Sequence, residues 1–123
     1  MDGADLVVLA TSSASPVIDS GWISPGCYVT TVGPKQVGRA EFPLDLVARA
    51  DVAVTDSLAQ IPAYDPPNIL AGTPHARRLT LLGAILAGDA RGRTSHDQVI
   101  VFCSVGLAGT ETYLLDRLVR APG

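Results

Sequence analysis

The sequence has few of the residues that mark common metal and redox sites. Its 123 residues include two cysteines, Cys27 and Cys103, which stand far apart and outside any CxxC pair. This spacing argues against a zinc site and predicts two buried free thiols, because an unpaired cysteine packs like a small apolar side chain. His75 and His96 have no cluster of metal-ligand neighbours, so no metal is expected and both are predicted to face solvent. His75 also has an alternative at the start of a helix, where it could approach an anion.

Basic patches and long apolar runs are also missing. Nine Lys and Arg against twelve Asp and Glu give a net charge of -3, and the basic residues are scattered. Nucleic acid is therefore not an expected partner. The apolar run near residue 6 is too short for a signal peptide or a membrane span and follows no basic stretch. We expect a cytoplasmic protein with no membrane contact.

The composition is that of a folded domain. Hydrophobic residues make up 47% of the chain and charged residues 17%, a balance typical of globular proteins rather than disordered ones. A chain of this length can bury roughly two thirds of the surface that it exposes when unfolded. No repeat or low-complexity segment interrupts it, so residues 1–123 are interpreted as one domain.

Short apolar runs alternate with helical patterns along this domain. Runs without polar alternation predict strands buried on both faces at residues 6–10, 28–32, 52–55 and 99–102. Helices are predicted over 43–50, over 75–87 with a cap at Gly88, and over 108–120 with Leu114, Leu115 and Leu118 facing inward. Residues 61–74 hold four prolines and should be irregular. The order predicts an α/β fold with a parallel sheet of about four strands and flanking helices.

Small or polar residues follow each predicted strand. They are Thr11, Ser12 and Ser13; Val32, Gly33, Pro34 and Lys35; Thr55, Asp56 and Ser57; and Cys103, Ser104, Val105 and Gly106. Ligands bind beyond the carboxyl ends of parallel strands, and hydroxyls and bare amides there suit a ribose or an amide. Turn-forming residues end strands in any α/β protein, however, so Gly33 and Gly106 are equally well explained by positive φ, and Asp56 and Ser57 by a helix cap.

Four segments in order resemble motifs of the ornithine cyclodeaminase and mu-crystallin family. They read ADLVVLATSSASPVI, GWISPGCYVTTVGP, GRAEFPLDLVARADVAVTDS and DQVIVFCSVGLAGTE, and they cover nearly the whole chain. The resemblance implies the C-terminal part of a Rossmann-type NAD(P)-binding domain, a three-layer fold. It also implies an ancestral NAD(P)-dependent imine (ketimine) reductase or amino-acid dehydrogenase.

The resemblance also assigns roles to residues at the strand ends. It implies that Thr11 and Ser12 lie near the nicotinamide ribose of NAD or NADP and Val32 and Gly33 near the ring. Ser104 and Val105 would form the base of the pocket.

The sequence departs from the family at positions that carry chemistry. Cyclodeaminases have an aspartate where Lys35 stands, so deamination is disfavoured relative to imine reduction, with a solvated loop lysine as the alternative. Cyclodeaminases also have an acidic residue at the position of Cys103. Glu111 stands where the family often has an aspartate, and it either substitutes weakly for that aspartate or simply begins a helix. The catalytic residue therefore stays unassigned.

No GxGxxG occurs in these 123 residues, so the usual loop for a pyrophosphate is missing from them. The first strand would then keep an unpaired edge, which predicts a homo-oligomer, a dimer in the first instance, or a complementary chain.

We expect a truncated or split family member that is inactive alone. The alternatives are a non-catalytic, self-associating α/β module that binds a partner protein or a small metabolite, and a fragment with arbitrary boundaries.

Overall fold

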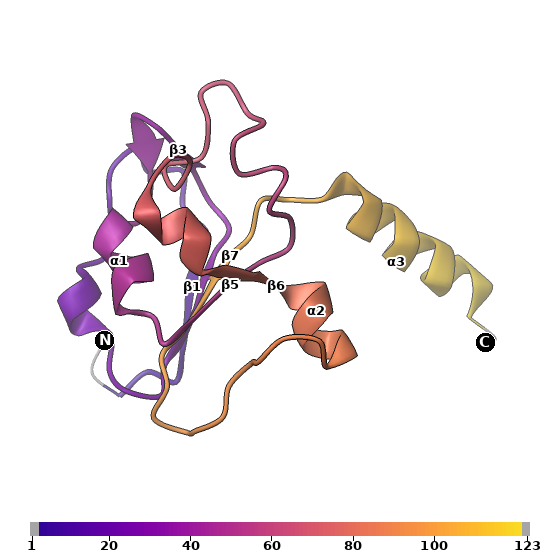
Figure 1. Ribbon diagram of the computed structural model, residues 1–123. Coiled ribbons are helices and arrows are strands. Elements are labelled where there is room, and N and C mark those ends of the chain that lie inside the picture. The colour runs from indigo at the N-terminus through magenta and orange to yellow at the C-terminus, as the bar shows by residue number, and fades with distance from the viewer. Residues whose placement is uncertain (1–2, 122–123) are drawn as a thin grey trace.

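The computed structural model describes residues 3–121 and contains a five-stranded parallel sheet (Figure 1). The strands lie in the order β1-β2-β7-β5-β6. Their bounds are β1 Leu6–Leu9, β2 Tyr28–Thr31, β5 Val52–Thr55, β6 Leu79–Leu81 and β7 Ile100–Cys103. A separate antiparallel pair is formed by β3 Lys35–Gln36 and β4 Arg39–Ala40. The helices are η1 Ser20–Trp22, α1 Leu44–Arg49, η2 Pro74–Arg78, α2 Leu82–Ala87 and α3 Ala108–Arg120. The α/β prediction with a parallel sheet is confirmed.

One face of the sheet carries most of the core. Val7 and Leu9 of β1 are buried on this face, while Leu6 and Val8 on the other face are 59% and 54% exposed. Successive side chains of a strand point to opposite faces, so the alternation shows that β1 is covered on one side only. The expectation that every strand is buried on both faces is wrong for β1, because its second face is exposed at Leu6 and Val8.

The predicted helix over residues 43–50 is present as α1, and it covers the core face. Its Leu46 and Val47 are buried, and Arg78 of η2 donates hydrogen bonds to the carbonyls of Val47 at 3.0 Å and Ala50 at 2.5 Å. These carbonyls lie at the end of the helix, where the backbone has no partner within the helix. The guanidinium therefore joins η2 to α1 on the same layer.

The predicted helix over residues 75–87 is wrong in its first half. Residues 74–78 form η2, and Leu79–Leu81 form β6, which adds a fifth strand to the sheet. Only Leu82–Ala87 form an α-helix. Leu79 pairs with Ala53 of β5 and is 7% exposed, so backbone pairing at the sheet edge overrides the helical spacing of the leucines. Gly88 does end α2, with φ of +83° and its N–H donated to the carbonyl of Ile85, as predicted.

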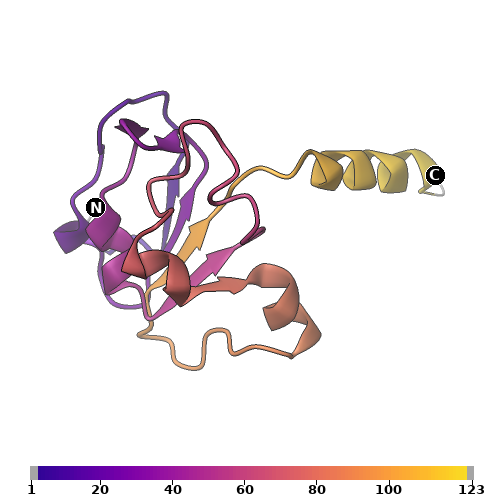
Figure 2. The same cartoon turned by 45° about the horizontal axis from the view of Figure 1, so that its top comes forward.

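Helix α3 has its predicted bounds but points away from the sheet (Figures 1 and 2). Its large apolar side chains are 54 to 77% exposed, so the expectation that Leu114, Leu115 and Leu118 face inward is wrong. They are Tyr113, Leu114, Leu115, Leu118 and Val119. None of the helices between residues 3 and 121 combines the length and the apolar composition of a membrane span.

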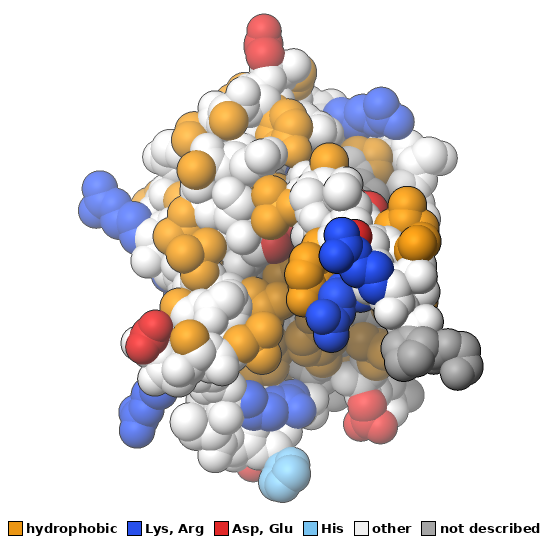
Figure 3. All heavy atoms as spheres, turned by 90° about the vertical axis from the view of Figure 1, so that its right-hand side faces the viewer, with side chains coloured by type: hydrophobic (Ala, Val, Ile, Leu, Met, Phe, Trp, Pro, Cys, Tyr) orange, Lys and Arg blue, Asp and Glu red, His pale blue; other side chains and the backbone are white. Residues whose placement is uncertain are grey.

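The second face of the sheet is only partly covered. Leu82 and Ile85 of α2 line a shallow, mostly apolar groove of about 130 Å³ over β5 and β7, and β1 lies beyond it. Figure 3 views the molecule from the side toward which α3 projects, where hydrophobic side chains are exposed among charged ones. The fold therefore has one well-packed layer and one open layer.

Candidate functional site

The carboxyl ends of the strands meet at one edge of the sheet. In register, Leu9 of β1 lies beside Thr31 of β2, Thr31 beside Cys103 of β7, and Cys103 beside Thr55 of β5. The segments that follow β1, β2, β7 and β5 therefore emerge next to one another. This is the edge where ligands bind in open parallel sheets, and it brings the predicted site segments together.

A buried carboxylate that the sequence reasoning missed joins the first two strand ends. Glu41 has no exposed surface; its Oε2 accepts hydrogen bonds from the Thr11 N–H at 2.8 Å and the Thr11 hydroxyl at 2.9 Å. Its Oε1 accepts from the Gly33 N–H at 2.6 Å. Three donors satisfy the charge, as a buried carboxylate requires. The only signal for this role in the sequence was an acidic residue within GRAEFP, directly after the residues that form β4.

The close approach of Glu41 explains why residue 33 is glycine. A Cβ at Gly33 would lie 2.2 Å from Oε2 of Glu41 and 2.5 Å from the carbonyl oxygen of Thr11. Gly33 does not have positive φ, so the turn explanation is wrong for it, whereas Gly106 does, with φ of +75°. The lack of a side chain at Gly33 therefore allows Glu41 and the Thr11 backbone to lie against the segment that follows β2.

A second carboxylate joins the ends of β5 and β7. Oδ1 of Asp56 accepts from the Val105 N–H at 2.8 Å, and Oδ2 accepts from the Ser104 hydroxyl at 3.3 Å. Tyr64 also donates its hydroxyl to the Val105 carbonyl at 2.9 Å. The helix-cap expectation for Asp56 and Ser57 is wrong, because a turn rather than a helix follows β5. Asp56 instead fixes the loop after β7.

Lys35 is buried in β3 rather than solvated in a loop. Its side chain is part of a residue only 8% exposed, and its Nζ donates to the Val32 carbonyl at 3.1 Å. Burial lowers the pKa of the Lys35 amine, and the charges of Glu41 and Asp56 oppose that change. The solvated alternative is wrong, because the residue is buried and its amine donates to a backbone carbonyl.

Both thiols are free and buried, as predicted. Burial raises the pKa of Cys103 from its ordinary 9.0 to about 12; the positive charge of Lys35 lowers it and the charge of Asp56 adds to the rise. Burial also raises the pKa of Cys27, with Asp5 adding to the effect. Neither thiol is therefore a thiolate near neutral pH, which is the form that attacks or binds metals.

The six residues expected to bind a cofactor lie at this edge but differ in access. Thr11 and Ser12 are exposed, Val32 is 54% exposed, and Gly33 and Ser104 are half-buried. Val105 is 5% exposed and its N–H already bonds Asp56. An apolar Val32 side chain flanked by hydroxyls is a suitable surface for a flat, amide-bearing ring.

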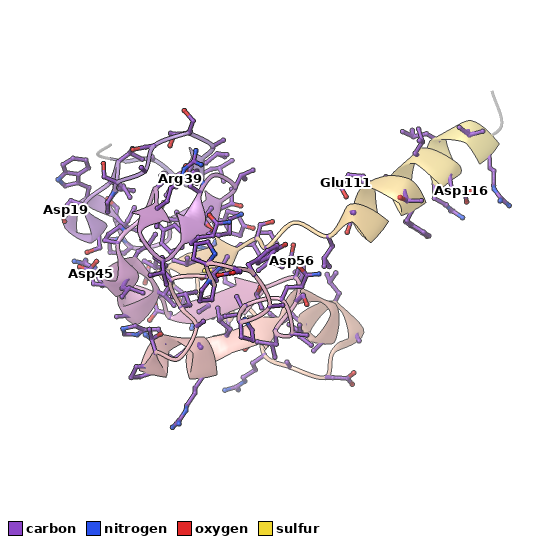
Figure 4. The ribbon with its side chains drawn as sticks, turned by 90° about the horizontal axis from the view of Figure 1, so that it is seen from above. Asp19, Arg39, Asp45, Asp56, Glu111 and Asp116 are labelled. Carbon is purple, nitrogen blue, oxygen red and sulfur yellow. The ribbon has the colours of Figure 1, made fainter. Side chains whose placement is uncertain are left out.

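Other candidate residues lie elsewhere. His96 is exposed in a loop and His75 is half-buried in η2. Glu111 lies in the first turn of α3, well separated from Asp56 (Figure 4), so it begins a helix rather than completing the site. Within the described part of the chain, no three His, Cys, Asp or Glu side chains gather as a metal site would require.

Comparison with known proteins places this geometry in a family. The model of the ornithine cyclodeaminase/mu-crystallin family matches residues 1–120. An ornithine cyclodeaminase of Agrobacterium tumefaciens is 26% identical over 98% of this chain and 33% of its own length.

Two solved structures are also similar. The iminosuccinate reductase of Paracoccus denitrificans, in complex with NAD+, is 29% identical with a TM-score of 0.75, over 94% of this chain and 36% of that one. The Δ1-pyrroline-2-carboxylate reductase of Thermococcus litoralis, in complex with NADH and L-proline, is 25% identical with a TM-score of 0.72, over 96% and 39%. The chain spans about a third of the curated relative's length. With its parallel sheet and these matches, the chain belongs to the ornithine cyclodeaminase/mu-crystallin family.

Proposed function

We propose that this chain forms the nicotinamide end of an NAD(P)-dependent site that reduces a small imine or oxidises the corresponding amino acid. The observation that carries the proposal is the meeting of Thr11, Val32 and Ser104 at one sheet edge, fixed by two carboxylates. The T. litoralis and P. denitrificans relatives, both solved with nicotinamide cofactors, support it.

The residues at this edge fit a nicotinamide group. The exposed Val32 side chain offers an apolar contact for the ring, and the hydroxyls of Ser12 and Ser104 can bond its ribose and amide. When bound, the reduced ring supplies hydride to the carbon of a C=N bond. Thr11 and Gly33 hold the edge in shape, because Glu41 already takes their N–H groups.

Residues 1–123 contain no GxGxxG, so the proposal requires that the pyrophosphate be held by residues outside them. The test titrates the purified chain with NADH and with NADPH by nicotinamide fluorescence, alone and co-expressed with the part of the T. litoralis reductase that this chain does not match. Saturable binding in the co-expressed sample, with weak or no binding by the chain alone, is expected. A folded co-expressed assembly that binds neither cofactor would overturn the proposal.

A second candidate is a self-associating, non-catalytic module, favoured by the exposed apolar residues of α3 and by Leu6 and Val8 on the open face of the sheet. Exposed patches of this kind are common in interfaces. The molecular mass of the chain in solution, measured on the titration sample, distinguishes the two. A stable homodimer without cofactor binding would favour the module.

A further inference from the structure

Lys35 is the only lysine among the 123 residues, and the fold buries it. Lysine is almost never buried unless it is paired, because removing an ammonium group from water is costly. Between residues 3 and 121, the one ion pair within 4 Å joins Arg120 to Asp116 on α3, so Lys35 has no direct carboxylate partner there. Its burial therefore has no ordinary structural explanation.

Groups from four different strands, or from the residues that follow them, surround the amine. Nζ donates to the Val32 carbonyl at 3.1 Å, at the end of β2. The charged or titratable groups around it are Glu41 after β4, Asp56 after β5 and Cys103 at the end of β7. Glu41 and Asp56 each accept hydrogen bonds from backbone N–H groups, which hold them in place. The amine is therefore held at the sheet edge by a rigid frame.

Val32 connects this amine to the proposed ligand surface. The Val32 carbonyl binds Nζ, while the Val32 side chain is 54% exposed at the edge where the imine would meet the nicotinamide ring. The structure gives Nζ a single hydrogen bond, so further N–H groups of an ammonium are left to donate elsewhere. A group that donates a proton must lie within hydrogen-bond reach of its acceptor.

We propose that Lys35 is the residue that donates a proton to the nitrogen of the imine as that imine is reduced. This inference rests on the proposed function. As hydride reaches the imine carbon, the electron pair of the C=N bond moves to the nitrogen. That nitrogen takes a proton from Nζ, the N–H bond of Lys35 breaks, and Lys35 is left as a neutral amine. The substrate becomes an amine and the dihydronicotinamide is oxidised.

Burial shifts the acidity of the amine in the direction that this role needs. A proton donor works best when its pKa lies near the working pH, and burial lowers the pKa of Lys35 from its ordinary 10.5. Glu41, Asp56 and Cys103 raise that pKa but are outweighed by burial. The donor form is lost as the pH rises through this lowered pKa, so the reduction rate is expected to fall there.

The first test needs no cofactor. Because Lys35 is the only lysine, protein labelled with ¹⁵N at lysine Nζ gives one side-chain signal, and Lys35→Arg removes it. A titration midpoint below 10.5, with slow exchange of the Nζ protons, is expected. An ordinary midpoint with exchange as fast as that of free lysine would overturn the assignment and leave the cofactor proposal untouched.

The second test uses the co-expressed assembly with NADH and Δ1-pyrroline-2-carboxylate as the probe imine. Lys35→Met and Lys35→Arg are each expected to lower kcat by about 100-fold or more, with the Kd for NADH nearly unchanged. Arginine keeps the charge but does not release its proton in this pH range. The matched control is Arg49→Met, which removes one exposed positive charge at the end of α1.

A purely structural role predicts a different pattern, in which variants lower the melting temperature but keep the wild-type pH profile. Full activity of Lys35→Arg, or an unchanged pH profile, would overturn the proton-donor role. Failure of the wild-type assembly to bind NADH would overturn the proposed function and this inference together. A wild type that binds NADH while its Lys35 titrates normally overturns this inference alone.

Discussion

Glu41 and Thr11, thirty positions apart, are joined by two hydrogen bonds at 2.8 and 2.9 Å. Both donors belong to Thr11 and both bonds end on one carboxylate oxygen, while the other oxygen binds the Gly33 N–H. The residue that shapes the first two strand ends is therefore a glutamate outside them. Replacing Glu41 should therefore disturb the proposed cofactor edge, although Glu41 itself is not proposed to contact the ligand.

Glu41→Gln is expected to destabilise the fold by about 2 kcal/mol, because the new amide group turns a donor toward backbone N–H donors and hydrogen bonds to a charged group are lost. Urea unfolding measures the change. Glu111→Gln, on the exposed first turn of α3, should change stability by less than about 0.5 kcal/mol. Equal effects of the two variants would contradict the role given to Glu41.

Gly33→Ala is expected to destabilise the fold by about 1–3 kcal/mol, because the new methyl group would overlap Glu41 and the Thr11 carbonyl. Thermal unfolding checks this prediction. Gly109→Ala is the control: a Cβ there meets no atom within 4 Å, and alanine favours helix by up to about 1 kcal/mol. If Gly33→Ala were neutral, the close approach of the two segments would be wrong.

Asp56→Ala is expected to free the loop after β7, since the Val105 N–H and the Ser104 hydroxyl lose their acceptor. Hydrogen exchange of the Val105 amide should accelerate, and NADH binding by the co-expressed assembly should weaken. Asp89→Ala, in the exposed loop after α2, serves as the control. Unchanged exchange at the Val105 amide would contradict the role given to Asp56.

Ionisation of the Cys103 thiol should lower the stability of the fold at alkaline pH. The unfolded thiol ionises near 9.0, whereas the folded thiol keeps its proton until about 12, so the unfolded state is favoured as the pH rises between these values. Lys35 has the opposite effect on the stability of the fold between its lowered pKa and 10.5. Because Lys35 is present in both wild type and Cys103→Ala, its effect is common to the two proteins. The stability advantage of wild type over Cys103→Ala should therefore shrink above pH 9.0. A constant difference in guanidinium unfolding would contradict this prediction.

Helix α3 should mediate association if its apolar side chains form an interface. Leu118 is 73% exposed, so Leu118→Glu is expected to lower the mass in solution without changing helix content by circular dichroism. Thr110→Glu adds the same charge at an exposed position of the same helix and should leave the mass unchanged. A wild-type chain that is already monomeric would rule out self-association through α3.

Local pattern determined much of the architecture. Apolar runs identified four strands near their observed positions, Gly88 marked the end of α2, and the order of elements implied a parallel sheet. The family resemblance was also readable, because four motifs in order are carried by the residues themselves. These features depend on neighbours in sequence, so no contact between distant segments was needed to find them.

Tertiary structure alone decided the rest. Residues 79–81 have helical spacing but form a strand because β5 offers an edge to pair with, and α3 has an apolar stripe that finds no surface within residues 3–121. Glu41, Asp56 and Lys35 acquire their roles from partners 8 to 49 positions away or from burial, which no local pattern encodes. The physical reason is the same in each case: hydrogen bonds and desolvation depend on which segments meet, and that is fixed only when the chain folds.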